Sequence, residues 1–177
     1  RMFGLLDEEP GIADKPGASP LRLEGGELVF DSVSFAYGER TILKDVSFRV
    51  PAGQHVAIVG PSGSGKTTIS RLLFRFYDPQ SGAVRLDRQD LRDVTQSSLR
   101  AAIGVVPQDT IMFNSTIGHN IGYGRNGASH DEIVSAAKLA AIDEFIAGLA
   151  NGYDTMVGER GLKLSGGEKQ RVAIGYK

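Results

Sequence analysis

The feature that most constrains the fold of this chain is a glycine-rich run, Gly60–Thr68, which reads Gly-Pro-Ser-Gly-Ser-Gly-Lys-Thr-Thr. It follows His55–Val59, a short apolar run that ends at glycine, as a buried parallel strand does. It precedes apolar residues spaced i, i+3, i+4 and i+7, which predict a helix that Pro79 should stop. These apolar residues are Ile69, Leu72, Leu73 and Phe76. Strand, glycine-rich turn and helix in this order predict a loop that holds phosphate groups.

The residue types in this loop suit a triphosphate. Glycines let the backbone wrap an anion with its N–H groups turned inward, and the following helix adds the positive end of its dipole. In the pattern Gly-x-x-x-x-Gly-Lys-Ser/Thr, Lys66 reaches the β- and γ-phosphates and Thr67 ligates Mg²⁺. The residues predicted to bind nucleotide in this P-loop are Gly60, Pro61, Ser62, Gly63, Ser64, Gly65, Lys66, Thr67 and Thr68.

The competing interpretation of the P-loop is a glycine-rich turn before an ordinary helix. The chain has 23 glycines in 177 residues. With that composition, the four specified positions recur by chance in roughly 2% of sequences of this length. The apolar run before the loop and the amphipathic pattern after it lower that frequency several-fold. Phosphate binding is therefore the interpretation that we adopt.

A second glycine-containing motif lies at Leu164, Ser165, Gly166, Gly167 and Glu168. Ser165 and Glu168 form a capping box at the start of a helical pattern that runs on through Gln170–Ile174. Two glycines in a first turn weaken a helix by about 1 kcal/mol each. They also leave backbone N–H groups bare and open to an external anion. From these five residues alone, a well-capped junction between loop and helix is an equally good interpretation.

Composition narrows the classes of function. A length of 177 residues suits one domain with a sizeable core. Net charge is −1, from 20 basic and 21 acidic residues, so we expect no nucleic-acid partner. The sequence has no cysteine, which excludes disulfides and thiolate metal sites. No apolar run is long enough to predict a membrane span. The sequence begins at Arg1 without a signal peptide, and we expect an internal start.

The rest of the chain divides into a strand-rich first part and a helical later part. Three prolines make residues 7–20 an expected extended linker. The segments 28–37, 46–50, 83–86 and 103–106 have strand patterns. From about Ser115 the pattern is helical, and Ser129 with Glu132 forms a capping box before another helix.

The run Leu164–Gln170, Leu-Ser-Gly-Gly-Glu-Lys-Gln, resembles the signature motif of the nucleotide-binding domains of ABC transporters. In that family, the signature motif of one domain closes on the γ-phosphate held by the P-loop of another. The resemblance therefore implies a second nucleotide-binding domain as partner and two ATP molecules between the domains. Identical subunits would form such a head-to-tail pair with twofold symmetry.

Two further residues match family positions in the expected order. Tyr37, in Ser-Phe-Ala-Tyr, resembles the aromatic residue that stacks on adenine. Gln108, in Val-Val-Pro-Gln, resembles the Q-loop glutamine, which contacts Mg²⁺ and the attacking water and senses the transmembrane domain. Taken alone, a tyrosine at a strand end usually packs at a rim and a single glutamine is usually solvated. The two motifs that flank them favour the functional interpretation.

Other segments resemble those of exporters. Met112–Ile117 and Val157–Gly161 look like exporter features, and the second resembles the X-loop that contacts the transmembrane domains. Phe3–Pro10 resembles the segment that joins the last membrane helix to this domain in half-transporters. Asn120–Gly124 and Tyr153–Ser165 most resemble exporters for heavy-metal tolerance and the mitochondrial, iron–sulfur-related branch. The resemblance implies attachment to a membrane through the transporter, on the cytoplasmic or the mitochondrial matrix side.

The fold implied by the resemblance is α/β, that of a P-loop NTPase of the ABC ATPase type. We expect residues 1–22 to be a linker after a transmembrane domain and 23–177 to be the nucleotide-binding domain. Within it, 23–112 would form the antiparallel β subdomain and the P-loop core. Residues 113–177 would form the helical subdomain with the signature motif.

The family pattern continues from the signature helix to an apolar strand that ends in Asp-Glu, and then to a switch histidine. Here the sequence reads Gly175-Tyr176-Lys177 and ends. We therefore expect core strands of the fold to lie outside these residues. The three histidines all precede the signature motif and do not match the switch position. Phosphoryl transfer needs a general base and a complete Mg²⁺ shell, so we expect these 177 residues to bind ATP without turning it over alone.

Two other functions are alternatives to an exporter ATPase. A non-catalytic module could lend its signature motif to a partner, which requires Ser165 but no general base. An ABC ATPase of DNA maintenance would carry long heptads between its two motifs. The interval from Thr67 to Leu164 contains no such heptads, and exporter function is the prediction.

Overall fold

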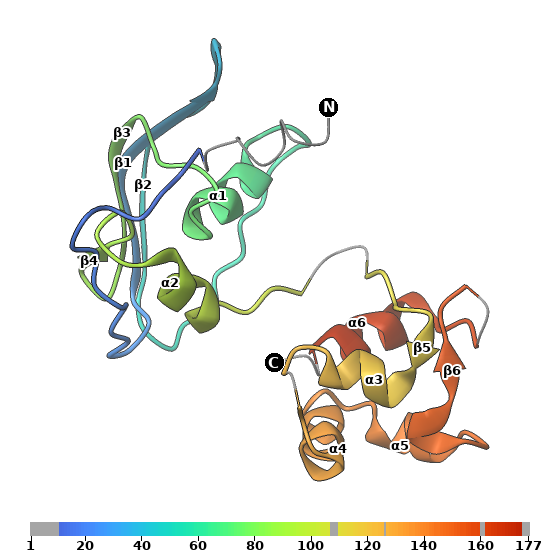
Figure 1. Cartoon of the computed structure of the whole chain (residues 1–177). Coiled ribbons are helices and arrows are strands. Elements are labelled where there is room, and N and C mark those ends of the chain that lie inside the picture. The colour runs from blue at the N-terminus through green and yellow to red at the C-terminus, as the bar shows by residue number, and fades with distance from the viewer. Residues whose placement is uncertain (1–10, 107–109, 126, 160–161, 175–177) are drawn as a thin grey trace, which may run out of the picture. The chain divides into compact units, whose positions relative to one another are not determined.

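The computed structural model of the chain describes residues 11–106, 110–125, 127–159 and 162–174. The chain divides into two compact units, Arg1–Ile103 and Gly104–Lys177 (Figure 1). Each unit has a hydrophobic cluster of its own. The subdomain boundary that the sequence suggests, near residue 112, stays a prediction.

The first unit is built on an antiparallel sheet with the strand order β2-β1-β3-β4. The strands are β1 (Leu28–Tyr37), β2 (Arg40–Val50), β3 (Ser81–Leu86) and β4 (Gln89–Asp90). The strands expected at 28–37, 46–50 and 83–86 are therefore confirmed. β2 begins earlier than expected because Gly38 and Glu39 form a tight turn that pairs Tyr37 with Arg40.

A bulge in β1 decides which of its side chains enter the core. Phe30 and Val33 are both buried although three positions separate them, and the register shifts between them. Ser32 lies in the bulge with a φ of 50°. Gly82 of β3 lies against it, with a φ of 78°, and a Cβ there would be 2.3 Å from the carbonyl oxygens of Asp31 and Ser32. Only glycine fits this close approach, so the bulge requires glycine at position 82.

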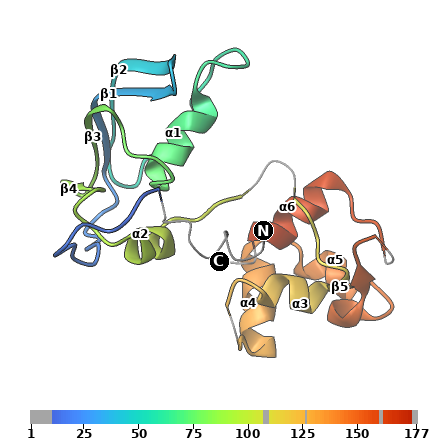
Figure 2. The ribbon, with the colours of Figure 1, turned by 45° about the horizontal axis from the view of Figure 1, so that its top comes forward.

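Two helices lie on the same side of the sheet, α1 (Lys66–Leu73) and α2 (Gln96–Ala102) (Figures 1 and 2). Leu72 of α1 and Leu99 of α2 are buried in one cluster with residues of the sheet. The buried residues of this cluster are Phe30, Val33, Phe35, Leu43, Leu72, Val84, Leu86, Leu91, Val94 and Leu99. Burial of such side chains contributes about 1.5–3 kcal/mol each, so this cluster holds α1 and the sheet together.

The helix predicted after the P-loop is shorter than its apolar pattern suggests. α1 ends at Leu73, well before Pro79, and Phe76 is 52% exposed. The chain leaves the helical path because Arg75 adopts a left-handed φ of 51°. Phe76 instead stacks on Phe74 and lies under the guanidinium of Arg100. The expectation that Phe76 extends the apolar face of the helix is therefore wrong.

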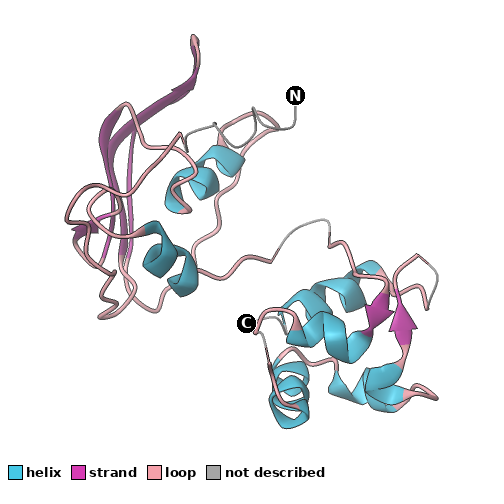
Figure 3. Cartoon of the chain, in the orientation of Figure 1, coloured by secondary structure: helices cyan, strands magenta, loops and turns pink. Residues whose placement is uncertain are grey.

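Two strands expected from short apolar runs are absent from the described residues. His55–Val59 forms loop, with Val56, Ile58 and Val59 each at least 46% exposed (Figure 3). The segment 103–106 is also loop, and Val105 and Val106 are about half exposed. A parallel strand exists only through hydrogen bonds to neighbouring strands and burial on both faces. Within the described part of the chain, neither segment is paired with a strand.

Residues 11–22, which we call the N-terminal strap, have no regular secondary structure apart from a turn at 16–17 and are hydrogen-bonded to the first unit. Ser19 forms a parallel bridge with Val94, and the amide of Leu21 donates to the hydroxyl of Ser98. The Gln96 amide donates to the carboxylate of Asp14 at 3.0 Å. The described part of this segment is therefore tied to the domain by hydrogen bonds, and its role as a linker stays a prediction.

Arg75 is the buried centre of this attachment, with 2% of its surface exposed. Its guanidinium donates to Asp78 at 3.1 Å and to the carbonyl oxygen of Val94 at 3.1 Å. It also donates to the carbonyl oxygen of Ala13 in the N-terminal strap at 3.3 Å. A buried cation is stable only when paired and hydrogen-bonded, and here its partners come from three segments of the chain.

Asp87, in the turn between β3 and β4, fixes the loop that follows the N-terminal strap. Its carboxylate accepts hydrogen bonds from the backbone amides of Glu24, Gly25, Gly26 and Glu27, at 2.8–3.1 Å. The amides of Gly26, Gly25, Glu24 and Glu27 hold the pKa of Asp87 far below its ordinary value. The charged form of Asp87 is therefore the one that stabilises the fold.

The second unit is mainly helical (Figure 3). Its helices are α3 (Ile117–Gly122), α4 (His130–Leu139), α5 (Asp143–Ala147) and α6 (Gly166–Ile174), with a 3₁₀ turn at Gly152–Asp154. A short antiparallel pair, β5 (Ser115–Thr116) and β6 (Met156–Val157), completes it. The predicted capping box at the start of α4 is confirmed. The Ser129 side chain accepts a hydrogen bond from the Glu132 amide, and the Glu132 carboxylate accepts one from the Ser129 amide.

No helix in the described ranges has both the length and the hydrophobicity that a membrane crossing requires.

We predict that Arg75→Met lowers the free energy of unfolding by about 2–4 kcal/mol, because it leaves buried acceptors without their donor. Arg85→Met is the matched control. Arg85 pairs with Asp31 at 2.7 Å on the surface, and such pairs contribute at most about 1 kcal/mol. Urea denaturation followed by circular dichroism measures both. Equal losses in the two variants would contradict the role given to Arg75.

We also predict a pH-dependent contribution from Asp87. Its folded-state pKa is depressed, so its stabilisation is fully present above the unfolded-state pKa of about 3.9 and is lost as the pH falls toward the folded-state value. Asp87→Asn should therefore destabilise the chain at pH 7, and the difference from wild type should shrink progressively as the pH falls below about 4. Urea midpoints across this range measure it, with Asp93→Asn as the surface control. A difference that stays constant with pH would exclude the mechanism.

Candidate functional site

The P-loop leads directly into α1, as the sequence predicts. The N-cap of α1 is Gly65, whose φ of 93° lies in the left-handed region, and Gly63 has a φ of 81°. A Cβ on Gly65 would be 2.7 Å from Cδ2 of Leu43 in β2. Glycine at position 65 is thus required both by the backbone turn and by the close approach of the loop to the sheet.

The Lys66 side chain folds back over the P-loop. Its Nζ donates to the carbonyl oxygens of Gly60 at 2.7 Å and Pro61 at 2.8 Å, and lies 3.4 Å from the Ser64 hydroxyl. The ammonium group therefore lies at the loop that opens α1, whose first N–H groups lack partners within the helix. A lysine cation and a helix N-terminus at one glycine-rich turn form an anion-binding arrangement, and the residues present fit the phosphates of a nucleotide.

The two threonines after Lys66 differ in exposure. Thr67 is exposed, and its carbonyl oxygen accepts from the Ser70 hydroxyl at 2.9 Å. Thr68 is 6% exposed, so its side chain is directed into the protein. Among the described residues there is no group of three or more histidines and acidic residues that could hold a metal. A hydroxyl such as that of Thr67 fits Mg²⁺, which commonly takes one or two protein ligands together with substrate phosphates.

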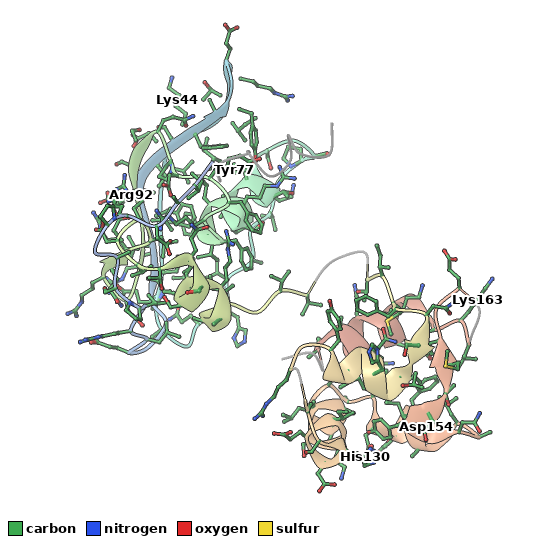
Figure 4. All side chains as sticks on the ribbon, viewed as in Figure 1. Lys44, Tyr77, Arg92, His130, Asp154 and Lys163 are labelled. Atoms are coloured by element: carbon green, nitrogen blue, oxygen red, sulfur yellow. The ribbon has the colours of Figure 1, made fainter. Side chains whose placement is uncertain are left out.

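Tyr37, at the end of β1, belongs to an aromatic group. Its ring is edge-on to Phe35, with centroids 4.8 Å apart, and edge-on to Tyr77, with centroids 5.2 Å apart. Tyr77 lies beside α1 (Figure 4). The hydroxyl of Tyr37 accepts a hydrogen bond at 3.0 Å from Arg71 of α1. The structure therefore brings Tyr37 next to the helix that the P-loop opens, although 28 residues separate Tyr37 from Gly65.

The signature motif, Leu164–Glu168, forms the start of α6 in the second unit. The capping box is confirmed, since the Ser165 amide donates to Glu168 at 2.7 Å and the Glu168 amide donates to the Ser165 hydroxyl at 3.4 Å. Leu164 is buried and anchors the turn. A Cβ on Gly166 or Gly167 would have no atom within 4 Å. The glycines thus leave the helix N-terminus open to solvent, although packing would permit a side chain at both positions.

A hollow of about 410 Å³ lies beside the signature motif in the second unit. Its walls come from residues 110–112, from Gly158 and Glu159, and from Leu162–Leu164 with Lys169. Gly158 has a φ of 104°, and a Cβ there would be 2.8 Å from Cα of Asn114. The described part of the predicted X-loop is thereby held against the segment that follows the predicted Q-loop. Gln108 itself, like Arg160 and Gly161, lies outside the described residues.

Sequence reasoning did not identify Arg71, or the role of Asn120. Asn120 is fully buried, accepts from the Phe113 amide at 2.8 Å and donates to the carbonyl oxygens of Phe113 and Thr116. It therefore fixes the backbone of 113–116 in front of α3. No local pattern distinguishes either residue, because both act on partners that the fold brings close. Arg71 differs from other surface arginines only in the tyrosine that it contacts.

Comparison with known proteins agrees with this geometry. The family model described as "ABC transporter" matches residues 43–176. This interval covers both the P-loop with its helix and the signature motif with α6. The chain therefore belongs to the ABC transporter family, and its fold is that of an ABC ATPase domain.

Individual relatives place the chain near one branch of this family. It is 61% identical over 174 residues to the ATM1-type heavy metal exporter of Novosphingobium aromaticivorans, covering 98% of this chain and 29% of that protein. It is 58% identical over 175 residues to the mitochondrial iron-sulfur clusters transporter atm1 of Aspergillus fumigatus, covering 98% of this chain and 24% of the relative. The resemblance to exporters of this branch is confirmed.

A solved structure gives the same result for the fold. The structure of a bacterial Atm1-family ABC exporter with ATP bound matches with a TM-score of 0.90 and 60% identity. The match covers 99% of this chain and 31% of that one. The chain thus spans less than a third of the length of the relatives it matches.

Proposed function

We propose that this chain is the nucleotide-binding part of an exporter of the Atm1 type, in which binding and hydrolysis of ATP drive transport across a membrane. The observation that carries the proposal is the arrangement at the start of α1, where Lys66 closes on a glycine-rich loop at a helix N-terminus. The open, capped N-terminus of α6 supports it. So does identity of about 60% to exporters over almost the whole chain.

In the proposed site each group of this chain has a defined task. The loop amides, the N-terminus of α1 and Lys66 bind the β- and γ-phosphates, and Lys66 gives up its carbonyl partners to do so. Thr67 contributes a ligand to Mg²⁺, which neutralises phosphate charge, and Gln108 is proposed as a second contact. Tyr37 stacks on the adenine. The role of these residues is to position the nucleotide and to concentrate positive charge on its phosphates.

Besides the nucleotide, we propose that the chain binds another nucleotide-binding domain. Ser165, Gly166 and Gly167 present backbone N–H groups and a hydroxyl on a surface where no side chain intervenes. This arrangement suits the γ-phosphate of a nucleotide held by a neighbouring subunit. The P-loop and the signature motif of one chain then serve two different nucleotides, and the complete site requires two chains.

The remaining partners are the transmembrane domains. We assign contact with them to Gln108 and to Val157–Gly161. The hollow beside the signature motif is lined by Gly158 and Glu159 of the second segment and by residues 110–112. The N-terminal strap continues the segment that leads from the membrane part. The domain would then lie on the cytoplasmic face of a bacterial inner membrane or on the matrix side of mitochondria. Because the relatives are a heavy metal exporter and an iron-sulfur clusters transporter, the proposed substrate is related to heavy metals or iron-sulfur clusters.

We predict that Lys66→Ala weakens binding of MgATP by at least about tenfold, since charge-assisted hydrogen bonds contribute about 1.5–3 kcal/mol. Isothermal titration of the purified chain measures the dissociation constant. Lys138→Ala, which removes an exposed lysine from α4, is the control and should bind as wild type. Unchanged affinity in Lys66→Ala would refute the proposed nucleotide site.

A second prediction concerns Gly167. Alanine fits at this position without contact and favours helix by up to about 1 kcal/mol, so Gly167→Ala should raise the midpoint of thermal unfolding. The added methyl group would obstruct the approach of a neighbour's phosphate, so association of the chain in MgATP should weaken. Sedimentation velocity with and without MgATP measures this, with Arg171→Ala on the same helix as control. If the Gly167→Ala variant is more stable than wild type but associates as strongly, the signature motif is not part of the interface.

A further inference from the structure

Three contacts fix the orientation of Tyr37 before any ligand binds. Phe35 meets its ring at 90° and Tyr77 at 84°. The third contact is polar, since Nη1 of Arg71 donates to the Tyr37 hydroxyl at 3.0 Å. The two rings restrict rotation of the Tyr37 ring about its own axis, and the hydrogen bond holds the hydroxyl end of the side chain in place.

Arg71 projects from the helix that carries the P-loop lysine. It lies five residues after Lys66, which is about 7.5 Å along the helix axis. Side chains of a helix tilt toward its N-terminus, so the Arg71 side chain leans toward the P-loop. Its guanidinium carbon lies 6.0 Å from the centre of the Tyr37 ring. Under the proposed function, the base of a nucleotide whose phosphates lie at the start of α1 stacks on Tyr37, which Arg71 contacts.

The described arginines of the first unit have different partners: some pair with carboxylates, Arg100 donates to the side chain of Gln96, and Arg71 donates to a tyrosine hydroxyl. Arg49, Arg85 and Arg92 each pair with a carboxylate, and Arg75 pairs with two. Among the residues that the structure describes, no carboxylate lies within salt-bridge distance of Arg71. Its described hydrogen bond goes to a neutral phenol instead. An exposed guanidinium that orders a tyrosine contributes little to folding, so a role in ligand binding explains the contact better.

We propose that Arg71 is a positioning residue for base recognition, which holds the side chain of Tyr37 in the place where its ring stacks on the base of the bound nucleotide. This inference rests on the proposed function, because it assigns the base to Tyr37. The physical reason is preorganisation, since a side chain that is already ordered loses less freedom on binding. Stacking on an aromatic ring requires a purine or pyrimidine base. Arg71 should therefore affect nucleotides and leave inorganic tripolyphosphate unaffected.

Titration of the purified chain with MgATP and with magnesium tripolyphosphate tests the inference. Arg71→Met should weaken ATP binding about three- to tenfold and leave tripolyphosphate binding unchanged. Tyr37→Phe keeps the ring and removes the acceptor, so it should lose a similar factor for ATP alone. The double variant should lose no more than either single variant, because both remove one interaction.

Arg100→Met is the matched control. Its guanidinium lies 5.3 Å from the ring of Phe76 in the same unit, so the variant also removes a cation from an aromatic ring. It should bind both ligands as wild type. Thermal unfolding of Arg71→Met should match wild type, since Arg71 is exposed. If Arg71→Met folds poorly, Tyr37→Phe provides the same comparison of ATP binding with tripolyphosphate binding.

Two results would overturn the inference. Equal losses for ATP and tripolyphosphate would show that Arg71 acts on the phosphates or the loop. Additive losses in the double variant would show that it does not act through the Tyr37 hydroxyl. Lys66→Ala separates this outcome from failure of the proposed function. If Lys66→Ala weakens both ligands while Arg71→Met changes neither, only the role of Arg71 is wrong, whereas no effect of Lys66→Ala refutes the nucleotide site itself.

Discussion

The packing of α1 against the antiparallel sheet is the interaction on which the first unit depends. Leu72 of the helix is buried in one cluster with Phe30 and Leu43 of the sheet. The approach is so close at the helix start that Gly65 leaves no space for a Cβ against Leu43. Because burial of apolar surface fixes the axis of α1, it also fixes every polar group that the helix carries.

Three cations on or just beyond this helix serve three different purposes as a result. Lys66, at its start, closes on the carbonyl oxygens of the P-loop. Arg71, on its exposed side, orders the ring of Tyr37. Arg75, just past its end, is buried and ties the N-terminal strap to the domain. A shift of α1 would therefore move the proposed phosphate contact, the proposed base contact and the attachment of the N-terminal strap together.

In the second unit, the N-terminus of α6 is capped but is not covered by other residues. Leu164 is buried behind the turn, the capping box satisfies the amides of Ser165 and Glu168, and the two glycines remain open. Glycine is costly in a helical first turn, and the structure provides no steric reason for it. The proposed approach of a partner from outside would explain this cost.

Much of this was determined by the sequence itself. The P-loop, both capping boxes, the strands of the antiparallel sheet and the family follow from local patterns, because turn chemistry, caps and side-chain alternation act over a few residues. The tertiary structure decided the rest. Short apolar runs at 55–59 and 103–106 cannot become strands without neighbours to pair with, and α1 stops at Leu73 where Arg75 turns the chain into a buried network. The bulge in β1 depends on Gly82, and the partners of Arg71, Arg75 and Asn120 are known only once distant segments meet. Contacts between residues far apart in the chain leave no local pattern, and here they determine how Tyr37 is held beside the P-loop helix.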